Sequence, residues 1–313
     1  MIYLRYILIR LIAALPVLIA VTLFSFVAIK FVPGDPVRIM MRDRVTDAQV
    51  AEIHAKLGLD RPVLSQYASF VGKVAVGDLG QSIVQNQPVA TLVGERITPT
   101  LMLLAVGSVF SIMIAFPVAV LAAARPNRLF DQVVRALCMV GFAMPHFWVG
   151  LLLMLGLGIK LQLLPISGFG NGFVDHLIHM ILPGLTIALF LGPVLIRTLR
   201  ASMLEVMATD HIEVARARGL PSWRIFGKHA LRNALIPTLT VLAVNISWLI
   251  SGAVVIESVF ALPGLGSLLI QAVNFRDYPL IQGLCVVLAL TTIAINLIAD
   301  LSYVLVDRRV LRD

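Results

Sequence analysis

The stretch D-H-I-E-V-A-R-A-R-G, from Asp210 to Gly219, is a short charged segment between two long apolar runs. Asp210 is predicted to cap the first amides of a helix, and Glu213 follows three residues later to complete a capping box. Gly219, with Pro221 just beyond it, predicts the end of that helix. Because a polar helix of about two turns buries little apolar surface, we expect it to contact something from the water side.

Composition indicates that most of the chain lies in lipid. Hydrophobic residues make up 59% and charged residues 13% of the sequence, whereas soluble domains have about 45–50% and about 25%. A bilayer-spanning helix needs about 20 apolar residues. Six runs meet this length, which predicts an all-α integral membrane protein: Ile7 to Phe31, Thr100 to Ala124, Val133 to Ile159, Leu177 to Ile196, Ile236 to Ile256 and Leu280 to Val306.

The first apolar run is predicted to be a retained span, because it is too long for a signal peptide and lacks a small-residue cleavage site. Most of the 25 Lys and Arg residues lie in the two terminal segments and in every second connection between spans. Because basic residues gather on the cytoplasmic side, this distribution places both termini in the cytoplasm. These clusters are Arg5 and Arg10, Arg125 to Arg135, Arg197 to Arg232, and Arg308 to Arg312. The net charge of +8 therefore needs no nucleic-acid partner to explain it.

One extended water-exposed segment lies on the outer side, from about Val32 to Thr98. Thr46 begins a capping-box pattern followed by apolar residues at helical spacing. A second helix is predicted from Pro62 to Val76, and its apolar stripe comprises Leu64, Tyr67, Ala68, Val71 and Ala75. The segment either covers the outer ends of the spans or docks an external partner. The sequence does not choose between these two roles.

The predicted spans carry few ionisable groups, so an ion-coupled mechanism has only Asp300 as a candidate carrier. Polar residues inside the spans serve either helix packing or a translocation path, and the path candidates are His146, Asn245, Ser247 and Ser251. No Gly-x-Ser-x-Gly pattern supports a membrane-embedded hydrolase. Cys138 and Cys285 fall inside spans and are expected to be apolar packing residues, with no metal or disulfide spacing.

The chain also lacks its own nucleotide site. A P-loop requires Gly-x-x-x-x-Gly-Lys-Ser/Thr, and neither Gly72-Lys73 nor Gly227-Lys228 has the leading glycine or the following hydroxyl. Any ATP hydrolysis linked to this chain must therefore take place on another polypeptide, and we expect no cofactor or metal on this chain.

The segment Glu213 to Gly219 resembles the Glu-Ala-Ala-x-x-x-Gly loop of ATP-binding-cassette (ABC) importer permeases, with Val214 in place of the first alanine. Further motifs resemble the dipeptide, oligopeptide and nickel branch of that family and cover nearly the whole chain. They are F-V-P-G-D-P (Phe31 to Pro36), L-G-L-D-R-P (Leu57 to Pro62), G-D-L-G-Q-S (Gly77 to Ser82), the segment Ala215 to Pro237, E-S-V-F-A-L-P-G-L-G (Glu257 to Gly266) and R-D-Y-P (Arg276 to Pro279).

This resemblance implies a type I ABC importer permease fold with six transmembrane helices and a helical periplasmic segment after the first. It implies four kinds of partner: a second homologous permease, two ABC ATPase subunits, a periplasmic substrate-binding protein and the lipid bilayer of a bacterial inner membrane. The chain would be a transport subunit, not an enzyme, and would form half of the path. Short peptides are the expected substrate, with nickel chelates and glutathione left open.

The resemblance also assigns roles to residues. The ATPase-coupling helix would comprise Asp210, Glu213, Ala215, Arg216, Ala217, Arg218 and Gly219. Its arginines would meet acidic groups, its alanines would let it lie in a groove of the ATPase, and Val214 is expected to pack inward. The family usually has an aromatic and then a basic residue where this chain has His211 and Glu213. The periplasmic gate or docking loop would include Glu257, Pro263, Gly264, Leu265, Gly266 and Asp277.

The predicted organisation is a first span in residues 1–31, a periplasmic helical segment in 32–98, a core of five helices in 99–306 with a coupling loop at 200–235, and a cytoplasmic tail in 307–313. The main functional prediction is an ATP-driven importer permease. The alternatives are an ion-coupled secondary transporter or channel and a membrane-embedded hydrolase.

Overall fold

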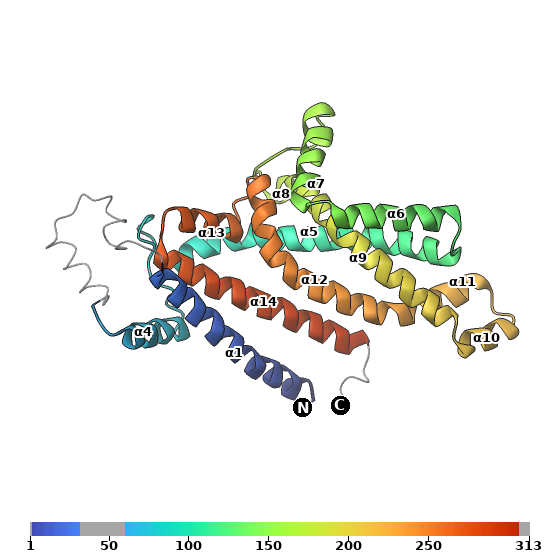
Figure 1. Cartoon of the computed structure of the whole chain (residues 1–313), viewed down its shortest axis with the longest axis horizontal. Helices are drawn as coiled ribbons and strands as arrows, with labels where there is room; N and C mark the ends of the chain where they lie inside the picture. The colour runs from blue at the N-terminus through green and yellow to red at the C-terminus, as the bar shows by residue number, and fades with distance from the viewer. Residues whose placement is uncertain (1, 32–59, 307–313) are drawn as a thin grey trace. The chain divides into compact units, whose positions relative to one another are not determined.

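The computed structural model describes residues 2–31 and 60–306, and these residues form helices joined by short connections (Figure 1). The helices are α1 (Ile2–Lys30), α4 (Val63–Ala75), α5 (Val89–Ala124), α6 (Leu129–Ala143), α7 (His146–Leu153), η1 (Met154–Lys160), α8 (Phe173–His179), α9 (Ile181–Met207), α10 (Asp210–Ala217), α11 (Ser222–Arg224), η2 (Ile225–Ala230), α12 (Leu231–Val259), α13 (Leu265–Asn274) and α14 (Tyr278–Val306). The chain divides into two compact units. The first comprises Met1–Thr100 with Pro263–Ala294, and the second Leu101–Leu262 with Ile295–Asp313.

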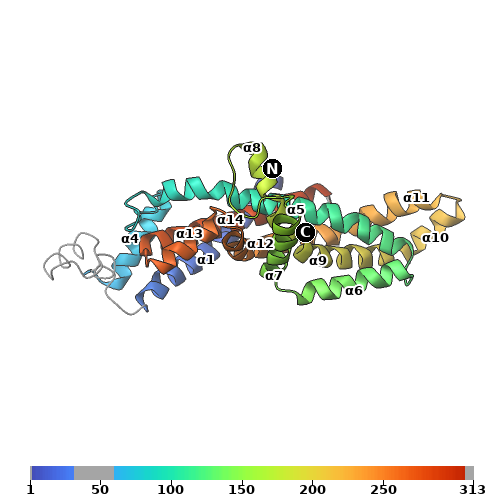
Figure 2. The same cartoon turned by 90° about the horizontal axis from the view of Figure 1, so that it is seen from above.

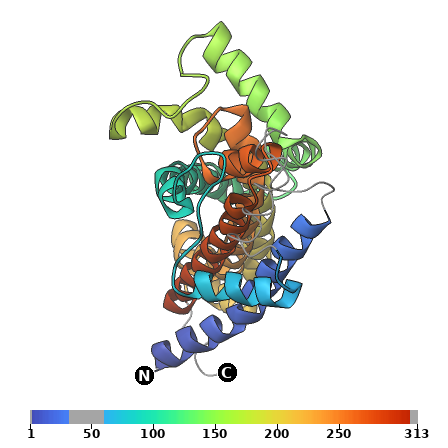
Figure 3. The same ribbon diagram turned by 90° about the vertical axis from the view of Figure 1, so that its left-hand side faces the viewer.

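Within the first unit, α4 crosses the second half of α1 (Figure 3). The ring of Phe26 on α1 packs against Tyr67 and Phe70 of α4, with centroids 5.5 and 6.4 Å apart. The Tyr67 hydroxyl also lies 3.1 Å from Thr22 Oγ1. The predicted helix from Pro62 to Val76 is confirmed as α4, but its predicted stripe holds only in part. Tyr67 of that stripe packs against α1, whereas Leu64 is 80% and Val71 36% exposed, and Phe70, outside the stripe, contacts Phe26 instead.

The core of the first unit joins the start of α5, the helix α13 and the start of α14. Its buried residues are Val89, Leu92, Val93, Leu265, Leu268, Ala272, Leu280 and Leu284. Gly283 allows α14 to approach the start of α5, because a Cβ atom there would lie 2.6 Å from Val89 Cγ1. The helix α13 begins directly after Gly264, and its first turn is closed by the Ser267 hydroxyl, which accepts from the Gly264 N–H at 3.1 Å.

The second unit is built around α9, whose buried residues run along almost its whole length. It packs against α12, α6 and α7, and α6 lies alongside it in Figure 2. Small residues permit close approach between apolar helices. A Cβ on Gly107 of α5 would lie 2.7 Å from Ile187, and one on Gly184 of α9 would lie 2.8 Å from Val106 Cγ1. Packing is thus a sufficient reason for the glycine at position 184.

The third apolar run does not form the single helix that the sequence predicts. Its two halves, α6 and the segment from His146 to Lys160, meet at an angle of 106°. Proline disfavours helical geometry in the residue before it, and Met144, which precedes Pro145, has the extended ψ of 129°. Five helices are long and apolar enough to cross a membrane, and the count reaches the predicted six when this bent pair counts as one span.

Other boundaries differ from the predictions at their polar ends. The second span begins at Val89, well before the apolar run at Thr100. The fourth begins at Ile181, after the separate helix α8, and continues to Met207. The fifth is continuous with the helical turns that start at Ser222. The helix predicted after Thr46 lies outside the described residues.

Candidate functional site

The charged helix predicted at Asp210 is present as α10 and rests on its own chain through an apolar seat. Ile212 and Ala215, three residues apart on one side of the helix, are buried together with Ile225 of η2. The partly buried side chains of Val206, Met207 and Leu220 pack against these three. The seat therefore fixes α10 to the end of α9 and to the start of the next helical segment. We use the term "seat" for these six residues.

The end of α10 follows the prediction and its start does not. Gly219 has φ +73°, its N–H donates to the Arg216 carbonyl at 2.9 Å, and the Leu220 N–H donates to the Ala215 carbonyl at 3.2 Å. This pair of bonds around a left-handed glycine is a Schellman motif. At the start, Thr209 is the cap residue, without a side-chain cap bond, and Asp210 is already helical. The predicted Asp210–Glu213 capping box is therefore wrong, and the Thr209 hydroxyl bonds to the Val206 carbonyl and to His211.

The outer face of α10 carries charge. Asp210, His211, Glu213, Arg216 and Arg218 are all exposed. Val214 is 51% exposed, so the expectation that it packs inward is wrong.

The two alanines of α10 differ in placement. Ala215 is 7% exposed and is part of the seat. Ala217 lies on the exposed side, so a contact with a groove of a partner stays a prediction for Ala217 and is excluded for the buried Ala215.

A buried ion pair beside this segment was not predicted from the sequence. Asp131, in the first turn of α6, has 0% exposure. It accepts hydrogen bonds from Nε and Nη2 of Arg200 on α9 and, at 2.8 Å, from the backbone N–H of Asn127. Arg135 lies one turn further along α6, with its Nε 3.8 Å from Asp131 Oδ2. The two partners are 69 residues apart in the sequence, so no local pattern links them.

The residues predicted to form an external docking loop lie mostly inside the structure. Glu257 at the end of α12 is buried, and so are Gly264, Leu265, Gly266 and Asp277, while Pro263 is half-buried. Asp277 is 1% exposed. Their side chains therefore shape this part of the chain instead of presenting a contact surface.

Asp277 ties two connections of the first unit together. Its carboxylate accepts a bond from the Ser82 hydroxyl at 2.5 Å and from the Val84 N–H at 3.2 Å, both at Oδ2. Oδ1 accepts from the N–H groups of Ile83 at 3.3 Å and Leu280 at 3.4 Å. We call this set of bonds the Asp277 clasp. Exposed side chains near it in the sequence include the apolar Val84, Ile270, Val273 and Phe275 and the polar Gln85, Gln271, Asn274 and Arg276. We call the four apolar residues the outer apolar patch.

No hydrogen bond or ring contact described for the four path candidates joins one of them to another. His146 opens α7 at the bend and packs against the ring of Phe190, with centroids 4.8 Å apart. Asn245 donates to the Val241 carbonyl of its own helix, and Ser247 contacts Asn296 of α14. Ser251 is exposed on α12. A polar path through the bundle therefore remains a prediction.

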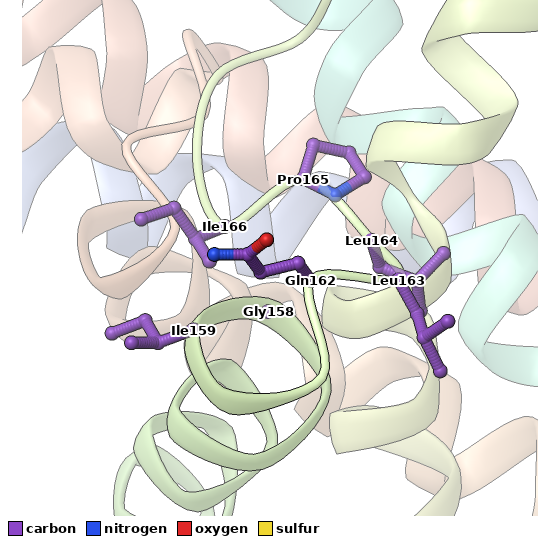
Figure 4. A pocket seen from close by; sticks show the side chains of 7 residues that line it. All are labelled: Gly158, Ile159, Gln162, Leu163, Leu164, Pro165 and Ile166. Atoms are coloured by element: carbon purple, nitrogen blue, oxygen red, sulfur yellow. The ribbon is translucent and has the colours of Figure 1, made fainter.

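A shallow hollow lies in the turn after η1 (Figure 4). It is lined by Gly158, Ile159, Gln162, Leu163, Leu164, Pro165 and Ile166, so the Gln162 amide is its single polar side chain. This lining offers no charged group to orient a ligand. Among the described residues, no group of three or more His, Cys, Asp or Glu side chains is placed to hold a metal ion.

Comparison with known families accounts for this arrangement of helices. The family model described as "Binding-protein-dependent transport system inner membrane component" matches residues 115–312. The model of the N-terminal part of such components matches residues 3–105. The chain belongs to this family of importer permeases. It is thus a multi-pass inner-membrane transport subunit, and the secondary-transporter and hydrolase alternatives lose their support.

Named relatives extend over nearly the whole chain. The oligopeptide transport system permease protein AppB of Bacillus subtilis is 37% identical over 311 residues, covering 97% of this chain and 98% of its own. The dipeptide transport system permease protein DppB of Escherichia coli K12 is 36% identical, with 98% of each chain covered. The di/tripeptide permease DppB of Pseudomonas aeruginosa is 35% identical, with 95% of each covered.

A solved structure shares the fold. The inward-facing MetNI methionine ABC transporter matches with a TM-score of 0.58 at 19% identity, covering 69% of this chain and 96% of that chain. The fold is therefore that of an ABC importer permease.

Proposed function

We propose that this permease forms half of the translocation path for short peptides in an ATP-driven importer. The names of the relatives, which are oligopeptide, dipeptide and di/tripeptide permeases, support this class of substrate. A related small solute such as a nickel chelate or glutathione is the competing substrate class, because the described residues contain no pocket that selects a peptide. The partner permease would be a second homologous chain.

The observation that carries the proposal is the two-sided nature of α10. One side is buried in the seat, and the other presents Glu213, Arg216 and Arg218 to solvent. A short helix fixed in this way transmits a push on its charged side directly to α9. We assign that side to one of two ABC ATPase subunits, which would bind ATP and Mg while this chain carries no cofactor.

The basic residues support an orientation with α10 and both termini in the cytoplasm. In that orientation the Asp277 clasp and the outer apolar patch face the periplasm. Contiguous exposed apolar side chains often mark a protein interaction site. We assign the patch to the periplasmic substrate-binding protein, with the buried residues Glu257, Gly264, Leu265, Gly266 and Asp277, together with Pro263, holding the loop in shape. His146, Asn245, Ser247 and Ser251 remain the proposed path residues.

The deciding experiment compares Glu213→Lys with Glu95→Lys in the assembled importer, reconstituted in sealed vesicles with dipeptide, ATP and the binding protein. Both glutamates are exposed, and Glu95 lies on α5 in the first unit. Glu213→Lys should lower peptide uptake while ATP hydrolysis continues, and Glu95→Lys should leave both unchanged. Equal uptake in the two variants would refute the assignment of α10. ATP-independent uptake driven by an imposed proton gradient would refute the ATP-driven class itself.

A further inference from the structure

We propose that Asp131 and Arg200 are positioning residues that join α6 and the α10-bearing end of α9 into one lever. This inference rests on the proposed contact between α10 and an ATPase. It adds a route by which a displacement of α10 reaches a second helix of the bundle. The route consists of two fixed joints, one apolar and one ionic.

The apolar joint is the seat under α10. Val206 and Met207, in the last turn of α9, pack against Ile212 and Ala215. Leu220 closes the other end of α10 through its Schellman bond and the same cluster. The break between α9 and α10 at Ala208 and Thr209 is therefore held on both sides, and α10 cannot tilt without moving the end of α9.

The ionic joint lies two turns back along α9, about 10 Å from its end at Met207. Arg200 donates from two nitrogen atoms to the two oxygens of Asp131. A bidentate arginine–carboxylate pair fixes orientation as well as distance. The pair is also shielded from water, since Asp131 has 0% and Arg200 has 16% side-chain exposure. It is therefore a rigid link, unlike an exposed surface ion pair, which contributes little.

Asp131 also fixes the turn that leads into α6. The N–H of Asn127, which has φ +61°, donates to Asp131 Oδ2. The carboxylate lies in the first turn of α6, where the helix dipole favours a negative charge. Arg135, 47% exposed and 3.8 Å away, adds a weaker interaction. One carboxylate thus joins three segments, which are the α5–α6 connection, the start of α6 and the C-terminal part of α9.

The far end of this lever is the bend after α6. The chain turns by 106° between Ala143 and His146, and α7 packs separately against α9, where Gly150 lies close to Thr186. Because α6 and α7 both pack against α9, a movement of α9 would carry the two helices on either side of the bend together.

The test uses variants that keep charge and volume. Arg200→Lys retains the cation but loses bidentate geometry. In the full importer it should lower the peptide transported per ATP hydrolysed by about tenfold, equivalent to about 1.4 kcal/mol of coupling. The matched control is Arg197→Lys, one turn earlier on the same helix at an exposed position, which should not change this ratio. An unchanged ratio in Arg200→Lys overturns the lever.

A second measurement separates positioning from simple support of the fold. Spin labels at Val133 of α6 and Val214 of α10, both about half exposed, report the distance between the two helices in the assembled complex. We expect a single narrow distance that is the same in nucleotide-free and ATP-trapped states, and a broader distribution in Arg200→Lys. A distance that changes between the two states in the unmodified chain overturns the proposal. If Glu213→Lys leaves coupling intact while the distance stays fixed, the ATPase contact fails but the lever stands.

Discussion

Replacing Asp277 by Asn should loosen the external connection around Ser82 while leaving the helices in place. The carboxylate accepts four hydrogen bonds, of which the Ser82 hydroxyl at 2.5 Å and the Val84 N–H at 3.2 Å have good length. The bonds from Ile83 and Leu280, at 3.3 and 3.4 Å, are weak. An asparagine keeps one oxygen and presents an NH₂ group where the second oxygen was.

The magnitude follows from these four contacts. A hydrogen bond to a charged group contributes about 1.5–3 kcal/mol, and a neutral one about 0.5–1.5 kcal/mol. If the amide oxygen stays toward Ser82 and Val84, each of these two bonds loses about 1 kcal/mol of charge assistance. The local opening free energy should then fall by about 2 kcal/mol, which is about a 30-fold increase in the open population.

Hydrogen exchange of the peptide containing residues 82–84, in the assembled importer, measures this population. Exchange of the Ile83 and Val84 amides should accelerate by about 30-fold in Asp277→Asn. The control is Asp78→Asn, since Asp78 is exposed and accepts a bond only from the Gly80 N–H, at 2.9 Å, among the bonds described for its side chain. Unchanged exchange at Ile83 and Val84 would show that Asp277 does not hold this connection.

Three further predictions follow from the seat, the close helix contacts and the charge distribution. Ile212→Asp places a carboxylate at a position with 0% exposure, so α10 should detach from its seat and become sensitive to protease, with transport lost and membrane insertion retained. Gly107→Val should lower the thermal stability of the complex by about 1–3 kcal/mol through overpacking, whereas Gly192→Ala, which has nothing within 4 Å of its added Cβ, should be neutral in the same melting assay. A reporter fused after Asp78 should register as periplasmic and one after Ser222 as cytoplasmic, and external labelling at Ser222 in intact spheroplasts would reverse the orientation.

The sequence located α10 because its signals are local. The Gly219 stop and the run of charges between apolar segments depend only on neighbouring residues, and both are present in the structure. The start was misplaced by one residue. Thr209 and Asp210 are both good caps, and helix boundaries are uncertain by one or two residues without tertiary information.

Hydropathy identified the apolar spans, but it gave neither the bend within the third span nor the polar ends of the helices. Residues 133–159 are apolar apart from Arg135 and His146, but Pro145 sets Met144 extended and the chain turns by 106°. Conversely, α5 begins at Val89 although Glu95, Arg96 and Pro99 interrupt its apolar pattern. Its first turns are held by the core of the first unit, in which Val89 and Leu92 are buried against α13 and α14. Such burial is a tertiary effect that a sequence window cannot contain.

Two of the buried carboxylates, Asp131 and Asp277, share a local setting. Asp131 lies in the first turn of α6 and Asp277 immediately before α14. A residue with left-handed backbone precedes each of them. Asn127, at φ +61°, lies four residues before Asp131, and Arg276, at φ +54°, lies directly before Asp277. A helix start supplies free N–H groups and a favourable dipole, so an acid can be buried there at lower cost than in the middle of a span. Each carboxylate also accepts a bond from a distant segment, Arg200 in one case and Ser82 in the other.

In a chain with so few charges, an acid at the first turn of an apolar helix therefore indicates a tie between that helix and a remote segment. The sequence shows where such an acid stands, but the partner depends on the fold. For Asp131 the partner is Arg200, which counted only as one of several basic residues fixing the orientation of the chain. A count of charges treats Arg200 and Arg197 as equivalent, but their burial differs. Arg197 is exposed, whereas the Arg200 guanidinium binds a carboxylate with 0% exposure. The difference between these two neighbouring arginines is what the substitution of each by lysine measures.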